Sequence, residues 1–198
     1  PLEVVEFVPR DALGDEVLQA VRLGTAFFGK GQFKADSIQT MDEAVVLRQE
    51  LEGPYYQLFP FGELPDDGDW EKMPREKRPT SEVQFLRSVV KVSEVEDGFA
   101  LDFNIDGTDD VPLAVELGFR PGGKLSGVEE VPGIPMAYYL KAGEGSYRFG
   151  NDVIGFGPSL HDHGWTQIRG AEDKMEAISV YLTGFTPFRF RLVIKKGR

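Results

Sequence analysis

His161 and His163 are the residues whose type and spacing most directly suggest chemistry, and the chain contains no other histidine. In a β-strand, residues i and i+2 project from the same face, so two imidazoles at this spacing can chelate one cation. The same pair can also contact a ligand or transfer a proton without a metal. Gly157 and Gly164 flank the pair, so a surface loop with two polar histidines is the competing interpretation.

The His-x-His spacing resembles the start of the metal site in cupin enzymes, whose fold is a jelly roll. That resemblance implies a small metal-dependent enzyme with a transition metal bound by His161 and His163. A cupin, however, places a glutamate a few residues after the pair and a third histidine about two strands later. Here the next glutamate is Glu172, nine residues beyond His163, and there is no third histidine. The transition-metal site is therefore kept as an alternative.

A second chemistry would use the same part of the chain. Polysaccharide lyases withdraw the C5 proton of a uronate with tyrosine or histidine, and a cation such as arginine neutralises the carboxylate. Residues of these types on neighbouring predicted strands are Tyr138, Tyr147, His161, His163 and Arg169. Tyrosine is also a common strand residue, so ordinary sheet packing competes with the catalytic interpretation.

The segment from Asp102 to Gly107 matches the first half of a calcium loop. Asp102, Asn104 and Asp106 place oxygen ligands at alternate positions, and the glycine allows the sharp bend that follows. Leu113 stands where an EF-hand needs a bidentate glutamate, which excludes an EF-hand. A shorter loop that binds Ca²⁺, completed by an aspartate from the following turn, is the hypothesis retained. The alternative is the solvated face of a strand.

Aromatic residues provide a further resource, because exposed rings stack on the apolar faces of sugars. The candidates for such ligand binding are Tyr55 and Tyr56, which follow Gly53-Pro54, together with Trp70 and Trp165. An acidic protein with these platforms suits a neutral glycan better than a sulfated one.

The elements that must position these residues are predicted to be strands. Apolar and polar residues alternate over 99–105, 111–120 and 188–194, which is the period of a half-buried antiparallel strand. Further strands are expected near 16–28, 43–52, 83–95, 124–131, 136–142, 145–149, 152–156, 163–169 and 177–183. Glycine-rich turns separate them, so we predict an all-β fold, an antiparallel β-sandwich of jelly-roll type, in one domain over 1–198.

The alternation of apolar and polar residues stops in the segment 60–82. This segment contains four prolines and eleven charged residues around Trp70, and its apolar residues do not recur at a regular spacing. We predict a long polar surface loop there, and loops of this length are often functional.

Composition excludes several classes of function. The net charge is −11, from 33 acidic and 22 basic residues, so neither nucleic acid nor an anionic membrane is an expected partner. No apolar run is long enough for a transmembrane helix. Without cysteine there is no disulfide, zinc–thiolate site or thiol nucleophile. This composition fits a secreted or periplasmic protein as easily as a cytoplasmic one, and the former is favoured here.

The stretches 137–158 and 179–188, from Ala137-Tyr-Tyr-Leu to Phe-Thr-Pro-Phe188, resemble the β-sandwich accessory domains of bacterial polysaccharide-degrading enzymes, including heparinase II/III-like lyases. The resemblance implies an accessory or glycan-contacting domain, with a carbohydrate or a catalytic module as its partner, and it transfers no catalytic residue. Two alternatives stay open: a small enzyme, either a lyase or cupin-like, and a structural domain that docks on a partner.

Overall fold

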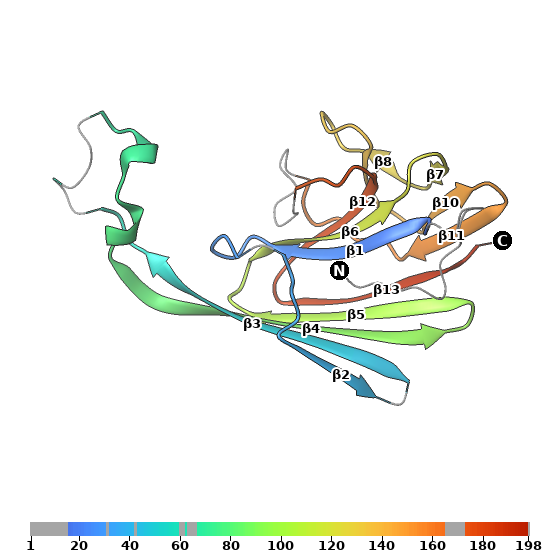
Figure 1. Ribbon diagram of the computed structural model, residues 1–198, viewed down its shortest axis with the longest axis horizontal. Coiled ribbons are helices and arrows are strands. Elements are labelled where there is room, and N and C mark those ends of the chain that lie inside the picture. Colours follow the sequence, from blue (N-terminus) through green and yellow to red (C-terminus); the bar gives the residue numbers. More distant parts are fainter. Residues whose placement is uncertain are drawn as a thin grey trace.

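The computed structural model describes residues 16–30, 32–41, 43–59, 62, 67–164 and 173–197, apart from the side chains of Trp70 and Arg75. This part of the chain is nearly all β-strand, in two sheets that pack face to face (Figure 1). The prediction of an all-β antiparallel sandwich is confirmed. The strand order does not establish the jelly-roll arrangement. Within the same residues, no helix is long or apolar enough to cross a membrane.

One sheet has five strands. Their order is β1 (Leu18–Thr25), β6 (Pro112–Phe119), β12 (Ile178–Phe185), β9 (Ala137–Tyr139) and β8 (Glu129–Glu130). Neighbouring strands are antiparallel except β9 and β12, which are parallel.

The other sheet has eight strands, all paired antiparallel. Their order is β2 (Ser37–Met41), β3 (Ala44–Tyr56), β4 (Thr80–Val95), β5 (Gly98–Gly107), β13 (Phe188–Lys196), β11 (Asp152–Gly157), β10 (Gly145–Phe149) and β7 (Lys124–Ser126). Strands β2 to β5 and β13 lie side by side in the lower part of the view in Figure 1.

The main core fills the space between the sheets. On β5, the alternating residues Phe99, Leu101, Phe103 and Ile105 are buried in it, as the period of the sequence predicts. The intervening side chains of β5 point to the outer face of the eight-stranded sheet. Burial of the apolar side chains, each contributing about 1.5–3 kcal/mol, is what holds the two sheets together.

Strand β6 differs from the half-buried strand that its sequence predicts. Leu113, Val115 and Leu117 enter the main core, but Ala114 and Glu116 on the opposite face are buried as well. A second apolar cluster covers this outer face of the five-stranded sheet and comprises Ala114, Val131, Ala137, Tyr139 and Tyr181, with Ile134 packed against it.

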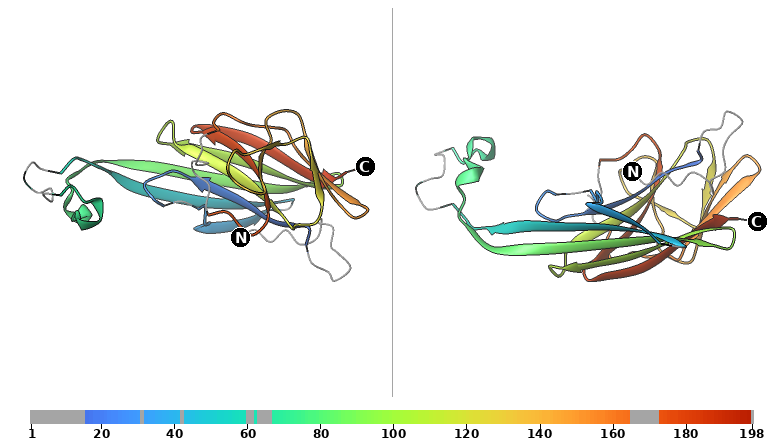
Figure 2. Two further views of the ribbon diagram at one scale, coloured as in Figure 1. Left: turned by 90° about the horizontal axis from the view of Figure 1, so that it is seen from above. Right: turned by 60° about the horizontal axis from the view of Figure 1, so that its bottom comes forward.

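Strands β3 and β4 are longer than predicted and extend beyond the sandwich as a two-stranded ribbon (Figures 1 and 2). Residues 57–59, 62 and 67–79 lie at its end and include two short 3₁₀ turns, η1 (Trp70–Lys72) and η2 (Arg75–Lys77). Of the surface loop predicted over 60–82, residues 62 and 67–79 belong to this tip, and 80–82 are instead the start of β4. Residues 60–61 and 63–66 lie outside the described residues.

Three other segments depart from the sequence prediction. The segment 37–41 forms β2, which the sequence analysis does not predict. The predicted strand near 124–131 is two short strands, β7 and β8, that belong to different sheets. Of the strand expected over 163–169, His163 and Gly164 are not in a strand, and the remainder lies outside the described residues.

Candidate functional site

Both histidines are anchored to Thr183 of β12, at the five-stranded sheet. His161 forms a bridge with Thr183, and its Nδ1 lies 3.3 Å from the hydroxyl oxygen of Thr183. The same hydroxyl donates to the backbone carbonyl of His163 at 2.6 Å and accepts from the backbone N–H of His163 at 3.3 Å. The pair is therefore held in place by one threonine side chain.

His163 is buried. Its Nε2 lies 3.1 Å from the carbonyl oxygen of Leu113, and its ring meets Phe185 edge-on with 5.1 Å between centroids. A carbonyl oxygen only accepts hydrogen bonds, so Nε2 carries the proton and donates. Nε2 is therefore occupied by a hydrogen bond to the backbone of β6, which favours a structural role for His163.

His161 is partly exposed and belongs to a small polar cluster with Tyr139, Lys141 and Glu129. Its ring packs against that of Tyr139 with 4.5 Å between centroids. Lys141 Nζ forms an ion pair with Glu129 Oε2 at 2.7 Å. The same Nζ lies 5.9 Å from the centre of the Tyr139 ring. Burial is the main cause that lowers the pKa of His161, and the charge of Lys141 adds to it, whereas Glu129 and Asp162 oppose the shift.

The described residues contain no group of three His, Cys, Asp or Glu side chains arranged to bind a metal. A cupin-type ligand set is thus not assembled in this part of the protein. Glu172, Arg169 and Trp165 lie outside the described residues.

The two tyrosines named in the lyase hypothesis are not beside His161. Tyr138 packs against the main core, while its neighbour Tyr139 points to the opposite face of β9, where His161 lies. Tyr147 is fully buried in the main core. Its hydroxyl donates to the carbonyl of Arg120 and accepts from the N–H of Gly123 at 2.7 Å. The lyase candidates within the described residues therefore do not form one site.

A buried ion pair lies on the same outer face of the five-stranded sheet and was not anticipated. Arg22 Nε donates to Glu116 Oε2 at 2.7 Å, and the hydroxyl of Tyr181 donates to Glu116 Oε1 at 3.2 Å. Arg22 also donates to the carbonyl of Asp173 at 2.9 Å. Burial, followed by the charge of Glu116, raises the pKa of Tyr181. In the sequence, the one sign of this ion pair is Glu116, a charged residue within the otherwise apolar segment 112–119.

The calcium hypothesis is not supported by the placement of its residues. Asp102, Asn104 and Asp106 alternate along β5 on the outer face of the sheet instead of surrounding one point. Arg191 Nη1 lies 2.8 and 2.7 Å from the two carboxylate oxygens of Asp102. Arg189 pairs with Asp106 at 3.1 Å. Arginines on β13 thus neutralise the carboxylates that were expected to bind Ca²⁺.

The predicted aromatic platforms Tyr55 and Tyr56 lie on the ribbon and are exposed. The guanidinium of Arg78 lies 5.5 Å from the centre of the Tyr56 ring and donates to the carbonyls of Gln57, at 2.9 Å, and Tyr56, at 3.1 Å. Trp70 begins η1 at the tip, and the structure describes its backbone alone.

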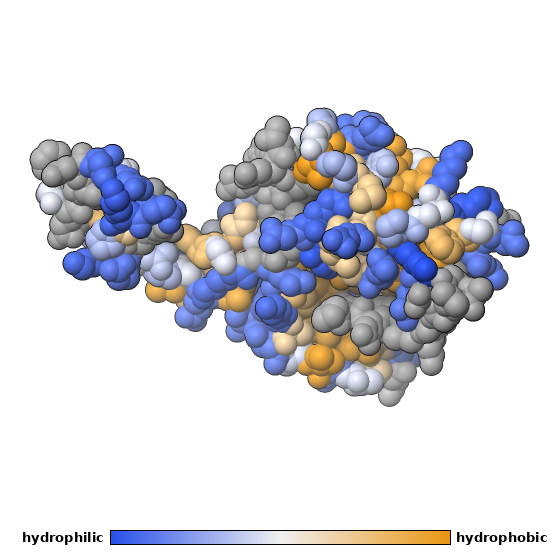
Figure 3. Space-filling model, turned by 45° about the horizontal axis from the view of Figure 1, so that its top comes forward, coloured by the Kyte–Doolittle hydropathy of each residue, from blue (hydrophilic) through white to orange (hydrophobic). Residues whose placement is uncertain are grey.

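Three exposed apolar residues of the ribbon and its tip were missed by the sequence analysis. Leu58 is 86 % exposed, Phe85 54 % and Val83 52 %. Together with Tyr55 and Tyr56 they form what we call the arm surface, and Figure 3 shows apolar surface along this ribbon. Val83 and Phe85 have the same parity as Arg87, on the face of β4 opposite to buried Leu86. In the sequence, the apolar positions therefore change from one face of β4 to the other between Phe85 and Leu86.

No protein-family model, no curated protein and no solved structure matches this chain.

Proposed function

We propose that this β-sandwich is an accessory module of a polysaccharide-degrading enzyme system and that it docks on a catalytic module through the arm surface. The observation that carries the proposal is the concentration of exposed apolar side chains on a ribbon that projects from the sandwich.

An isolated two-stranded ribbon is at best marginally stable in water, because it has no second layer on which to bury its apolar side chains. Val83 and Phe85 lie on one face of the ribbon, since they are two residues apart on β4. Contact with a partner surface would cover both side chains and supply the missing layer. Aliphatic residues such as Val83 and Leu58 pack on protein surfaces and have no preference for sugar hydroxyls, which favours a protein partner for this surface.

The identity of the partner is inferred from the sequence. The stretches that resemble accessory domains of polysaccharide-degrading enzymes include β9, β10 and β11 and most of β12, and such domains pack against a catalytic module. The polar cluster of His161 and the buried Arg22–Glu116 pair provide no assembled catalytic group within the described residues, so the proposal assigns no catalysis to them.

Site-specific photo-crosslinking tests this function. A photoreactive phenylalanine analogue is placed at Val83 or Phe85 in the complete protein within its source cells, with Lys195 on the exposed face of β13 as the control position. The expected result is a crosslink, from the two ribbon positions only, to a polypeptide that carries a glycoside hydrolase or polysaccharide lyase module. Crosslinks to unrelated proteins, equal crosslinking from Lys195 or no crosslink would overturn the proposal.

A second candidate is direct glycan contact by the ribbon, which the exposure of Tyr55 and Tyr56 favours. Affinity electrophoresis in gels that contain a neutral or a uronate polysaccharide tests it. Retardation that is lost in Tyr55→Ala/Tyr56→Ala and retained in Val83→Ala supports glycan contact. Equal mobility of all variants with and without polysaccharide contradicts it.

A further inference from the structure

Strand β2 is an edge of the eight-stranded sheet with an open side. It pairs with β3 on one side, and within the described residues no strand pairs with its other side. All five residues of β2 are exposed, and Ile38 is 67 % and Met41 53 % exposed. The outward-facing backbone N–H and C=O groups of an edge strand form a template on which another extended segment can pair.

The sequence of β2 contains none of the features that usually protect an edge. Ser37–Met41 reads SIQTM and has no charged residue, no proline and no glycine. The other three edges differ: β7 has three residues and begins with Lys124, β8 consists of two glutamates, and β1 contains Arg22 and a register shift near Leu18. Strand β2 is therefore the edge best suited to accept a strand.

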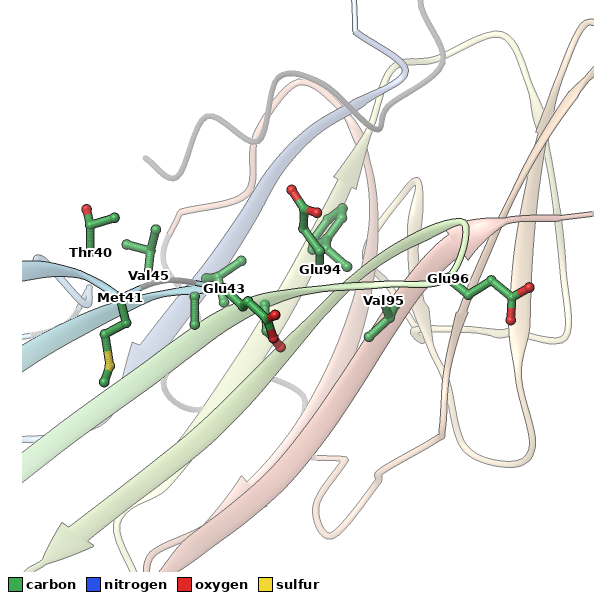
Figure 4. Close-up of a pocket in the computed structure, with 11 residues that line it drawn as sticks. Thr40, Met41, Glu43, Val45, Glu94, Val95 and Glu96 are labelled. Atoms are coloured by element: carbon green, nitrogen blue, oxygen red, sulfur yellow. The ribbon is translucent and has the colours of Figure 1, made fainter.

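A surface hollow of about 690 Å³ adjoins this edge, between the turn that follows β2 and the turn that follows β4. Thr40 and Val45 are register partners and extend on one side of the sheet, and Glu94 extends on that side as well (Figure 4). Val92 and Phe99 also line the hollow, farther from the edge, on β4 and β5. A strand added along β2 would place alternate side chains beside Ile38 and Thr40, at the β2 side of the hollow, and such contacts of alternate side chains give strand addition its specificity.

The rim of the hollow is acidic. Glu43, Glu94 and Glu96 line it and are exposed, and none of them has an ion-pair partner among the described residues. A segment with lysine or arginine beside its apolar residues complements this charge. A second copy of the chain does not, because each copy has a net charge of −11.

We propose that β2 accepts an extended segment of a partner protein as an additional strand, with an apolar side chain in the hollow and basic residues beside Glu43, Glu94 and Glu96. This surface is separate from the arm surface, and the proposal does not depend on the function proposed above.

Selection from a phage-displayed library of random peptides on the immobilised protein tests the proposal without a known partner. The expected peptides combine alternating apolar residues with flanking lysine or arginine, and they bind more weakly as the salt concentration rises. Hydrogen exchange of the complex with the best selected peptide should slow at 37–41. Peptides that lack these features, or slowed exchange only elsewhere, would overturn the proposal.

Matched variants locate the binding site. Ile38→Lys puts a charge on the edge, and Glu43→Gln/Glu94→Gln/Glu96→Gln removes the rim charge, so each should weaken the peptide by about tenfold or more. Val83→Lys places the same charge on the ribbon and should leave the affinity unchanged, whatever the outcome of the crosslinking experiment. Equal affinities of all variants contradict the proposal. Sedimentation that shows a dimer, dissociated by Ile38→Lys, would identify a second copy as the occupant and also overturn it.

Discussion

The ring of His161 packs against the ring of Tyr139, with 4.5 Å between their centroids. Tyr139 is the register partner of Tyr181, and Tyr181 that of Glu116. These side chains therefore form a row on the outer face of the five-stranded sheet, from a buried carboxylate to a partly exposed imidazole. The charges that act on His161 at the end of this row are those of Lys141, Glu129 and Asp162.

We expect His161 to titrate below the ordinary histidine pKa of about 6.5, because burial and Lys141 both disfavour the imidazolium. The ring-proton resonances of His161 in an NMR titration give the pKa directly. Lys141→Met should raise that pKa, and Glu129→Gln should lower it further. Shifts of the same sign in both variants would contradict this electrostatic account.

The lowered pKa has a consequence for stability. As the pH falls, the unfolded chain takes up the proton at the ordinary pKa, before folded His161 does. The contribution of His161 is thus complete above pH about 6.5 and is lost as the pH falls through the lower pKa of the folded state. Urea unfolding at neutral and at mildly acidic pH should show a smaller loss of stability in His161→Gln than in the parent protein.

The buried pair of Arg22 and Glu116 should be sensitive to the loss of either partner. Arg22→Met leaves the carboxylate of Glu116 without its cationic partner, with only 3 % of its side chain exposed, and we expect a loss of about 3–5 kcal/mol in the free energy of unfolding. The control is Glu50→Gln, which breaks the exposed pair with Arg87 and should cost less than about 1 kcal/mol. Urea denaturation compares the two variants, and equal losses would show that burial does not matter here.

The sequence predicted the strands whose environment repeats with period two. On β13 and on β5 from Leu101 onward, one face meets the core and the other is exposed or half-buried, so the alternation of residues reports the structure directly. Strand β6 lacks this contrast because both of its faces are buried. The uncharged strand β2 is short and exposed on both faces, so it offers no alternation to detect.

The candidate site was predicted less well because it depends on register. Tyr138 and Tyr139 are neighbours in sequence, yet only Tyr139 lies on the face of His161, and a shift of one residue exchanges the two faces. Glu116 finds its partners on β1 and β12, which are distant in the sequence. Such pairings follow from strand order, which the local pattern does not contain.

We expect the role of Tyr147 to be structural, so that its substitution lowers the free energy of unfolding. Tyr147→Phe leaves the carbonyl of Arg120 and the N–H of Gly123 without their phenol partner, at a cost of about 1–3 kcal/mol. Tyr138→Phe is the matched control on β9 and should change the free energy of unfolding by less than about 0.5 kcal/mol. A catalytic role for Tyr147 would instead appear as lost activity with unchanged stability.

Calcium should have no effect on the thermal midpoint of unfolding. Asp102 and Asp106 are paired with Arg191 and Arg189, and a cation would have to displace these guanidinium groups. Differential scanning calorimetry in EDTA and in excess CaCl₂ should give coincident transitions. A rise in the midpoint with calcium that is abolished by Asp102→Asn would restore the calcium loop.

Removal of the ribbon tip should leave the sandwich stable. Tyr56 and Thr80 are register partners at the end of the paired region, so an Asn-Gly turn can join them in place of residues 57–79. None of the residues described in the deleted segment belongs to the main core, and we expect the free energy of unfolding to change by less than about 1 kcal/mol. Leu86→Ala, where β4 enters the core, should cost about 2–5 kcal/mol in comparison. A shortened protein that unfolds without cooperativity would show that the tip belongs to the folding unit and would remove the reason to regard the ribbon as a docking arm.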